Sequence, residues 1–333
     1  MSSTTLRIGI AGCGPVARVH LERLLALNEV EIVGCSDPDI HAAEMLSARL
    51  PNRQDESRIS FSDHRLLIQQ YSPDAMAIFT PPLAHYRPAM DALQADCHVF
   101  IEEPLSTNLQ EAVDIVGLAR GRCRKVGVGQ QYRLNPGLIE AKRLLAEGRI
   151  GPLRLIVATV TRASVAWSDP GSDESREIDQ NFSGGGVLTE FGVHLLDALL
   201  WTTGQEAVKA AAFQTRLVSG IDVVTAALIR LADQTPVTLA ISGTASTGLF
   251  ELNYFGEDGR LRATDHSLEL ETSRTPLTRL PLPEAVGSID GNFVAAVLSG
   301  SLLCCPAEEA IATVRLLEAL ARSATTGEVV DLT

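Results

Sequence analysis

The sequence predicts an α/β protein with a doubly wound parallel sheet in its N-terminal part and a C-terminal α+β part whose sheet is open and mostly antiparallel. Three observations support this prediction. The chain has 333 residues, short apolar runs alternate with helix-period segments up to about residue 130, and closely spaced strands dominate the remainder. Because this length is long for one hydrophobic core, we expect two domains, at 1–130 and 131–333.

Six short apolar runs in the first 130 residues have the length of buried strands, and helix-period segments separate them. Strands that are apolar on both faces and separated by helices predict a parallel sheet covered on both sides. The predicted strands are LRIGIA, VEIVGCS, RISF, DAMAIF, HVFI and KVGVG.

After residue 130 the predicted order is a helix, LNPGLIEAKRLLAEG, a strand, LRLIVATVT, a polar loop, and a helix over residues 187–201. Strands with short connections follow, which is typical of an antiparallel sheet, and two helices close the chain. These strands are AAAFQTRL, VVTAALIRL, VTLAISGTA, FELNYFG and GRLRAT.

The composition excludes several classes of function. With 28 Lys and Arg against 41 Asp and Glu, the net charge is −13, which disfavours nucleic acid and anionic membranes as partners. No apolar run is long enough to span a bilayer, and the first residues, MSSTTLRIGI, do not have the pattern of a signal peptide. The six cysteines form no CxxC pair, so we expect reduced thiols in a cytoplasmic protein.

The segment IGIAGCGPVARVH predicts a dinucleotide site. Gly12, Gly14 and Ala17 have a G-x-G-x-x-A spacing between the first strand and a helix, whose N-terminus can bind phosphates. Asp37 follows the second strand, twenty residues beyond Ala17, where an acid can bind a ribose diol and repel a 2′-phosphate. We therefore expect NAD rather than NADP. The alternative is a simple tight turn, with Asp37 capping the next helix.

Two further segments carry candidate site residues. Pro81 and Pro82 end the fourth strand, so that Thr80 and His85 are expected to face the cofactor, although local backbone could equally satisfy His85.

On the helix GGGVLTEFGVHLLDALLW, four side chains share one stripe, which places two carboxylates and an imidazole on an apolar helix. These side chains are Glu190, His194, Asp197 and Trp201. His194 is the best candidate to carry the proton of a hydride-transfer reaction. The alternative is an ordinary Glu–His pair with a hydrogen-bonded Asp.

Taken together, these motifs resemble the glucose–fructose oxidoreductase, inositol dehydrogenase and rhizopine catabolism (Gfo/Idh/MocA) family. The resemblance extends through nearly the whole chain, in GCGPVA, TPPLAH, HVFIEEP, QYRLNP, EGRIGPLR, GGGVLTEFGVHLLD and SATTGEVVDL. It implies a Rossmann domain, a second domain with an open antiparallel sheet, and NAD(P)-dependent oxidation or reduction of sugars, cyclitols and related compounds by a homo-oligomer, a dimer or tetramer.

The resemblance also implies roles for particular residues. Arg133, in QYRLNP, matches a position near the nicotinamide and the substrate, and Asp197 is expected on the substrate side. The cofactor-side positions are Gly12, Gly14, Ala17, Asp37, Thr80, Pro81, His85 and Glu102.

Two departures from the family pattern concern the catalytic residues. The family motif Glu-Lys-Pro, whose lysine is the acid/base, is Glu102-Glu103-Pro104 here, and Glu190 stands where an aspartate is usual. The chain has three lysines, at 125, 142 and 209, and none lies beside these motifs.

Three interpretations of the exchange remain open. In the first, His194 carries the proton while Glu103 and Glu190 bind a cationic substrate such as an amino sugar or an imine. In the second, Glu103 is itself the base, and neighbouring carboxylates raise its pKa. In the third, the protein is an NAD-binding sensor or regulatory subunit without turnover. The first two together are favoured. No metal is expected, because no spacing rule supports one. The acidic loop 167–182 could cover the substrate, although a solvated surface loop is the better interpretation.

Overall fold

The computed structural model describes residues 5–51, 59–163, 185–217, 220–285 and 287–332. The chain forms two compact units: Met1–Gln130 with Gly287–Ile311, and Gln131–Val286 with Ala312–Thr333. The loop 167–182, which the sequence offers as a cover for the substrate, lies outside the described residues. Among the described helices, none is long and apolar enough to cross a membrane.

The first unit contains a six-stranded parallel sheet in the order β3-β2-β1-β4-β5-β6, which is the Rossmann order. The predicted fold is therefore confirmed. The central strands are apolar on both faces because helices flank the sheet, and β1, β4 and β5 are almost fully buried. The strands are β1 (Leu6–Ala11), β2 (Val30–Ser36), β3 (Ser60–Phe61), β4 (Ala75–Ile78), β5 (His98–Ile101) and β6 (Val126–Val128).

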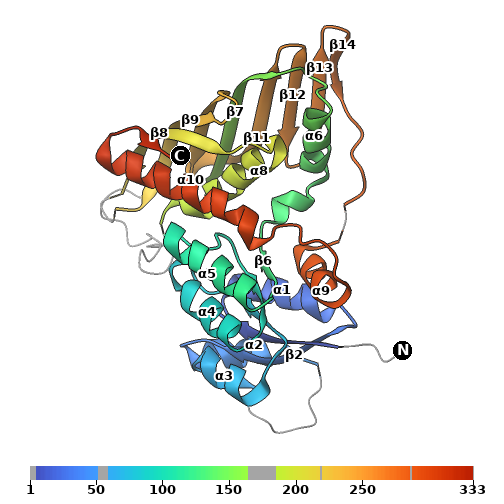
Figure 1. Cartoon of the computed structure of the whole chain (residues 1–333), viewed down its shortest axis with the longest axis vertical. Helices are drawn as coiled ribbons and strands as arrows, with labels where there is room; N and C mark the ends of the chain where they lie inside the picture. The colour runs from blue at the N-terminus through green and yellow to red at the C-terminus, as the bar shows by residue number, and fades with distance from the viewer. Residues whose placement is uncertain (1–4, 52–58, 164–184, 218–219, 286, 333) are drawn as a thin grey trace. The chain divides into compact units, whose positions relative to one another are not determined.

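Helices α1 to α5 alternate with the strands of the first unit along the chain, whereas α9 comes much later in the sequence, after β14 (Figure 1). Helices α3, α4 and α5 pack next to one another in series, whereas α9 packs against α1 and β5. Their bounds are α1 (Pro15–Leu25), α2 (Ile40–Ser47), α3 (His64–Tyr71), α4 (Tyr86–Gln94), α5 (Leu109–Gly121) and α9 (Ile289–Ser299).

The grouping of Gly287–Ile311 with the first unit differs from the single boundary expected after residue 130. Contacts within the unit explain it. Pro306 forms a β-bridge with Gly127 of β6, and the buried ring of Phe293 lies 5.5 Å from that of Phe100 in β5. A late segment of the chain thus completes the core beside β5 and β6.

The second unit contains a nine-stranded sheet in the order β14-β13-β12-β11-β7-β10-β9-β8-β15. All its neighbouring pairs are antiparallel except β7 with β10, which agrees with the predicted mostly antiparallel sheet. The strands are β7 (Leu153–Ala163), β8 (Ala207–Arg216), β9 (Asp222–Leu231), β10 (Pro236–Ser242), β11 (Thr244–Gly256), β12 (Gly259–Thr264), β13 (Leu268–Thr272), β14 (Thr275–Arg279) and β15 (Val330–Asp331).

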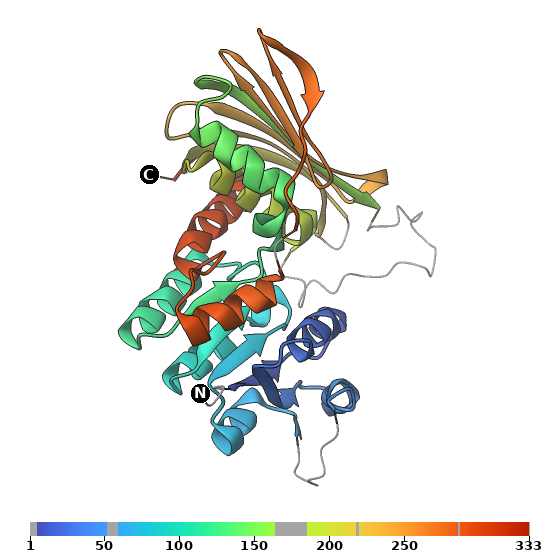
Figure 2. The same cartoon turned by 90° about the vertical axis from the view of Figure 1, so that its right-hand side faces the viewer.

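Helices cover one face of this sheet, as Figures 1 and 2 show for α6 and α8. Strand β9 has the corresponding alternation: Ala227 and Ile229 are buried in the core, whereas Leu228 between them is 61% exposed. The covering helices are α6 (Pro136–Ala146), α8 (Val193–Thr203) and α10 (Ala307–Thr326), the last from residue 312 onward.

We expect Phe293→Ala to lower the free energy of unfolding by about 3–5 kcal/mol, because it leaves a cavity between α9 and β5. Urea denaturation of the whole chain measures the change. The control is Leu302→Ala in the same returning segment, where the side chain is 89% exposed and the expected effect is within about 0.5 kcal/mol. Equal effects of the two substitutions would contradict the assignment of this segment to the core.

Candidate functional site

The turn between β1 and α1 leaves the N-terminus of α1 open. Gly12 has φ +89°, and a Cβ atom there would lie 2.5 Å from backbone atoms of Phe79 and Thr80, so only glycine fits. Gly14 is the N-cap residue and provides no side-chain cap. Apart from its chain neighbours, no described residue comes within 4 Å of where its Cβ would stand. The N–H groups of this helical turn are therefore available to an anionic ligand that approaches the backbone closely.

Two more predicted cofactor residues support this turn. Ala17 is fully buried in α1, which allows close helix–strand packing. The Asp37 carboxylate accepts hydrogen bonds from the backbone N–H of Cys13 and of Asp39, each at 2.9 Å. Asp39, not Asp37, caps α2, since its side chain accepts from the N–H of His41. Asp37 thus ties the end of β2 to the glycine turn.

The segment after β4 contains the predicted cofactor residues Thr80 and Pro81. The Thr80 hydroxyl is buried and has no hydrogen-bond partner among the described residues, so it can donate to a ligand. Pro81 is extended and precedes a short 3₁₀ turn, Pro82–Ala84.

His85 is fully buried, which agrees with the alternative that local backbone satisfies its ring. Its Nδ1 lies 2.8 Å from the carbonyl oxygen of Pro104, and its Nε2 lies 2.7 Å from that of Thr80. Burial lowers the pKa of the imidazole, against the two carbonyl contacts that favour its protonated form. The ring holds two loops together at the edge of the sheet.

Glu102 and Glu103 follow β5 at the carboxyl edge of the parallel sheet, where open α/β sheets bind their ligands. A Cβ atom at Gly129 would collide with the Glu102 carboxylate and lie 3.3 Å from Oε2 of Glu103. The two carboxylates therefore lie close to the same backbone position after β6. The glycine leaves the space that they occupy.

The sequence interpretation missed His20, which lies in the middle of α1. Its Nε2 forms an ion pair with Oε2 of Glu102 at 3.2 Å, and its Nδ1 lies 2.6 Å from Oδ1 of Asp290. Burial acts to lower the pKa of His20, but the hydrogen bonds with Asp290 and Glu102 outweigh it and raise this pKa to about 9. The partner Asp290 lies 270 residues away, so no local pattern could have revealed the pair.

In the second unit, His194 lies in the first turn of α8 and lines a cavity of about 420 Å³. Its ring centroid lies 5.2 Å from that of Tyr132, which in turn stacks on Phe250 at 4.2 Å. Arg162 donates to the Tyr132 hydroxyl at 3.2 Å and also lines the cavity. The cavity thus combines an imidazole, a phenol and a guanidinium. Its other polar lining residues are Gln131, Asn135, Asp265 and His266.

Glu190 precedes His194 on a different kind of helix from the one predicted. Residues Leu188–Gly192 form a π-helical turn, and the regular helix begins at Val193, so the predicted single stripe is interrupted. Glu190 does not line the cavity of His194 in the described part of the chain. Burial raises the pKa of Glu190, and nearby Arg162 partly opposes the shift.

Arg133 and Asp197, predicted to bind substrate, bind each other. Two parallel hydrogen bonds of 2.8 Å join the guanidinium to the carboxylate, and Thr313 donates to the same carboxylate at 3.1 Å. Asp197 is 1% exposed, and Arg133 is also buried and lies over the ring of Trp201. The pair therefore fixes α8, which carries His194, instead of presenting Asp197 to a ligand.

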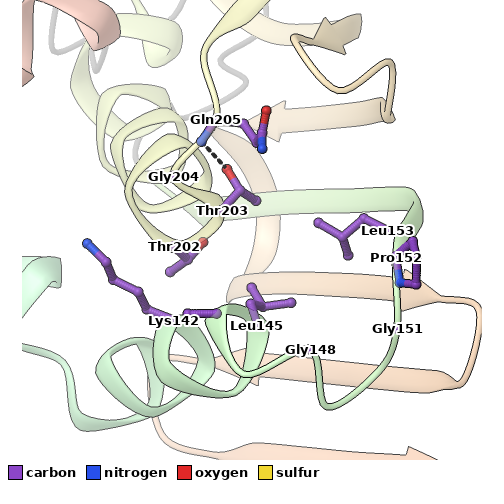
Figure 3. A pocket seen from close by; sticks show the side chains of 11 residues that line it. Lys142, Leu145, Gly148, Gly151, Pro152, Leu153, Thr202, Thr203, Gly204 and Gln205 are labelled. Carbon is purple, nitrogen blue, oxygen red and sulfur yellow. Dashed lines mark hydrogen bonds between the residues drawn. The ribbon is translucent and has the colours of Figure 1, made fainter.

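Figure 3 shows another cavity, of about 500 Å³, at the C-terminal ends of α6 and α8. None of the predicted site residues lines it. Its Thr203 hydroxyl accepts a hydrogen bond from the backbone of Gln205. Among the described residues, no group of three or more His, Cys, Asp or Glu side chains is placed to hold a metal ion.

Comparison with known families agrees with the two units. The model of an oxidoreductase family with an NAD-binding Rossmann fold matches residues 6–130, and the Gfo/Idh/MocA C-terminal domain matches residues 138–262. The fold and these matches define a protein with a Rossmann domain of the NAD-binding type that the family model describes. Because the two matches together cover more than half of the chain, the chain belongs to the Gfo/Idh/MocA family, as its motifs predicted.

Similar proteins include several dehydrogenases. The chain is 28% identical over 211 residues to D-glucoside 3-dehydrogenase of Escherichia coli strain K12, over 63% of this chain but only 57% of that enzyme. It is 25% identical over 253 residues to UDP-N-acetylglucosamine 3-dehydrogenase of Acidithiobacillus ferrooxidans, covering 76% and 72% of the two chains. The fold matches that of an oxidoreductase from Agrobacterium radiobacter in complex with NAD⁺, L-tartaric acid and magnesium, with a TM-score of 0.80, 17% identity and 99% coverage of both chains.

We expect Asp197→Ala to destabilise the protein by about 3–5 kcal/mol, because it removes one partner of a buried, bidentate ion pair. Thermal or urea unfolding measures the loss. Glu147→Ala is the control, since it removes the exposed partner of Arg143 and is expected to cost about 0.3–0.5 kcal/mol. An unaltered unfolding midpoint in Asp197→Ala would show that the pair is not structural.

Proposed function

We propose that the protein is an NAD-dependent oxidoreductase that transfers a hydride between the nicotinamide and a hydroxyl, carbonyl or imine group of a sugar, cyclitol or amino sugar. The observation that carries this proposal is the N-terminus of α1, which has no side-chain cap and begins after Gly14, where the backbone has open space beside it. Family membership supports the reaction type, and similar proteins named as glucoside and UDP-N-acetylglucosamine dehydrogenases support the substrate class.

The residues present fit a dinucleotide. The N-terminus of α1 would hold its phosphates, and the unpartnered hydroxyl of Thr80 would donate a hydrogen bond. Asp37 would accept from ribose hydroxyls, since each carboxylate oxygen has a second lone pair beyond the backbone N–H that it already binds. A negative charge there disfavours a 2′-phosphate, so we propose NAD in preference to NADP. When bound, the nicotinamide supplies the hydride chemistry.

His194 is the proposed proton carrier. Hydride transfer to or from a carbon–oxygen bond requires a proton to move at the oxygen, and an imidazole does this near neutral pH. The aromatic contact with Tyr132 holds the His194 ring in place. The helix is held by Asp197, one turn after His194, through its buried pair with Arg133. We assign Arg133 and Asp197 to positioning His194.

Glu103 and Glu190 are proposed to bind a positively charged group on the substrate. The carboxylate at position 103 replaces the lysine of the family motif and so reverses the charge there. A cationic amino group or iminium would be stabilised by such carboxylates. The raised pKa of Glu190 also suits a carboxyl that exchanges a proton during the reaction.

We also propose a homo-oligomer, a dimer or tetramer, formed through the face of the second sheet that the described helices leave uncovered. Phe213 of β8 is 80% exposed and Leu228 of β9 is 61% exposed on adjacent strands. Exposed large apolar side chains that lie together are typical of a protein interface.

His194→Gln is expected to lower kcat by about 10²- to 10⁴-fold, because the substitution removes the proton carrier without changing cofactor contacts. NADH-linked turnover in a panel of amino sugars, cyclitols and imines gives the rate, and NADH fluorescence gives cofactor binding. His41→Gln, in an exposed histidine of the first unit, is the control. A wild-type protein that binds NADH but turns over no member of the panel would instead favour a sensor or regulatory subunit.

Glu103→Lys is expected to raise KM for amino-sugar substrates by about 10- to 100-fold, because a charge-assisted contact with the substrate is replaced by repulsion. Steady-state kinetics with paired amino and neutral sugars measure it. Glu29→Lys, in an exposed carboxylate of the same unit, controls for the change in net charge. A gain of activity on neutral sugars would count against cation binding and show that the missing lysine had silenced an ordinary site.

A further inference from the structure

Four charged side chains of the first unit form a continuous chain behind the end of β5. Glu102 contacts His20 at 3.2 Å, His20 contacts Asp290 of α9 at 2.6 Å, and Arg23 of α1 lies 3.6 Å from the other oxygen of Asp290. With His20 protonated, negative and positive charges alternate from Glu102 to Arg23. Two helices and one strand end, from widely separated parts of the sequence, contribute to it.

These charged side chains are buried deeply enough to require this pairing. His20 is 4% exposed and Asp290 is fully buried, so each charge would be costly without its neighbour. The imidazole also stacks on Phe79, with ring centroids 4.5 Å apart and planes 17° from parallel, and it contacts Phe100. Aromatic packing and two carboxylates therefore fix the plane of the ring.

Glu102, at one end of these four charged side chains, lies at the ligand-binding edge of the sheet. The Glu102 side chain keeps 16% exposure, whereas its Oε2 atom, which faces His20, is buried. Part of the Glu102 side chain thus stays accessible after the end of β5, at the carboxyl edge of the parallel sheet. The absence of a side chain at Gly129 provides the space for it.

We propose that His20 and Asp290 are positioning residues that hold the Glu102 carboxylate in its orientation, so that it accepts a hydrogen bond from an N–H or O–H donor on the nicotinamide-ribose half of the cofactor. The inference rests on the proposed function, because it concerns the same dinucleotide site. It adds a charged support, supplied in part by the returning segment Gly287–Ile311, that the motifs do not contain.

A pH dependence of cofactor binding follows. The charged groups that face His20 are Glu102 from the end of β5 and Asp290 from α9, with Arg23 of α1 behind Asp290, while Phe79 and Phe100 are uncharged. The pKa of His20 is raised from its unfolded value to about 9. Its charge therefore stabilises the site fully below about pH 6.5, and this contribution is lost as the pH rises through about 9.

The test is an NADH fluorescence titration of the whole chain from pH 6 to 10.5. Wild-type affinity should fall by about 10- to 100-fold as His20 loses its proton, the size expected for a charge-assisted hydrogen bond. Asp290→Asn should move the midpoint of this fall to lower pH, since one carboxylate that favours the imidazolium is gone. His20→Gln should bind NADH more weakly at pH 7 and lose the alkaline step.

The matched controls are His64→Gln and Asp91→Asn, which break another His–Asp pair of the same unit, 2.9 Å apart. They should leave the pH profile unchanged. A shared loss of stability would affect both sets of variants alike, whereas the proposal requires the midpoint to move only in the first set.

A second measurement needs no variant. Because linkage is reciprocal, saturating NADH should raise the pKa of His20 in the wild-type protein, as followed by NMR of the labelled histidine rings. An unchanged His20 pKa on NADH binding, or an unmoved midpoint in Asp290→Asn, would overturn this inference alone. Failure of the wild-type protein to bind NADH at any pH would overturn the proposed function together with it.

Discussion

A charge removed from water must meet an opposite charge, and each unit of this protein contains a buried group built on that constraint. In the first unit, His20 lies between Glu102 and Asp290. In the second unit, Arg133 donates two hydrogen bonds to Asp197. Each group joins elements that are distant in sequence. Each also supports a residue assigned here to function, Glu102 in one unit and His194 in the other.

The helix α1 shows how one element serves two purposes. Its uncapped first turn follows Gly14 and offers backbone N–H groups to an anion, while its second turn contributes His20 to the buried charged side chains. The asymmetry is useful, because phosphates require unoccupied donors and a reacting ring requires fixed side chains. Asp37 and the imidazole of His85 hold the surrounding loops by backbone contacts.

Sequence patterns were sufficient where short-range order decides the structure. Apolar runs predicted the strands of the first sheet, and the glycine spacing predicted the turn before α1. The alternation in LELET, with both leucines buried, could have revealed β13 but was missed. Partners could not be predicted: nothing near Asp197 indicates Arg133, and a π-helical turn before Val193 displaces Glu190 from the expected stripe. Long-range pairing and local helix irregularity depend on the folded environment.

The return of Gly287–Ile311 to the first unit has a consequence for synthesis. Residues 1–130 are synthesised first, but the bridge partner Pro306 and the counter-charge Asp290 emerge only after residues 131–286 of the second unit. Until then His20 lacks half of its ionic surroundings. The nascent first unit must therefore wait for residues 287–311 before it can close, unlike a contiguous domain that folds as soon as it leaves the exit tunnel.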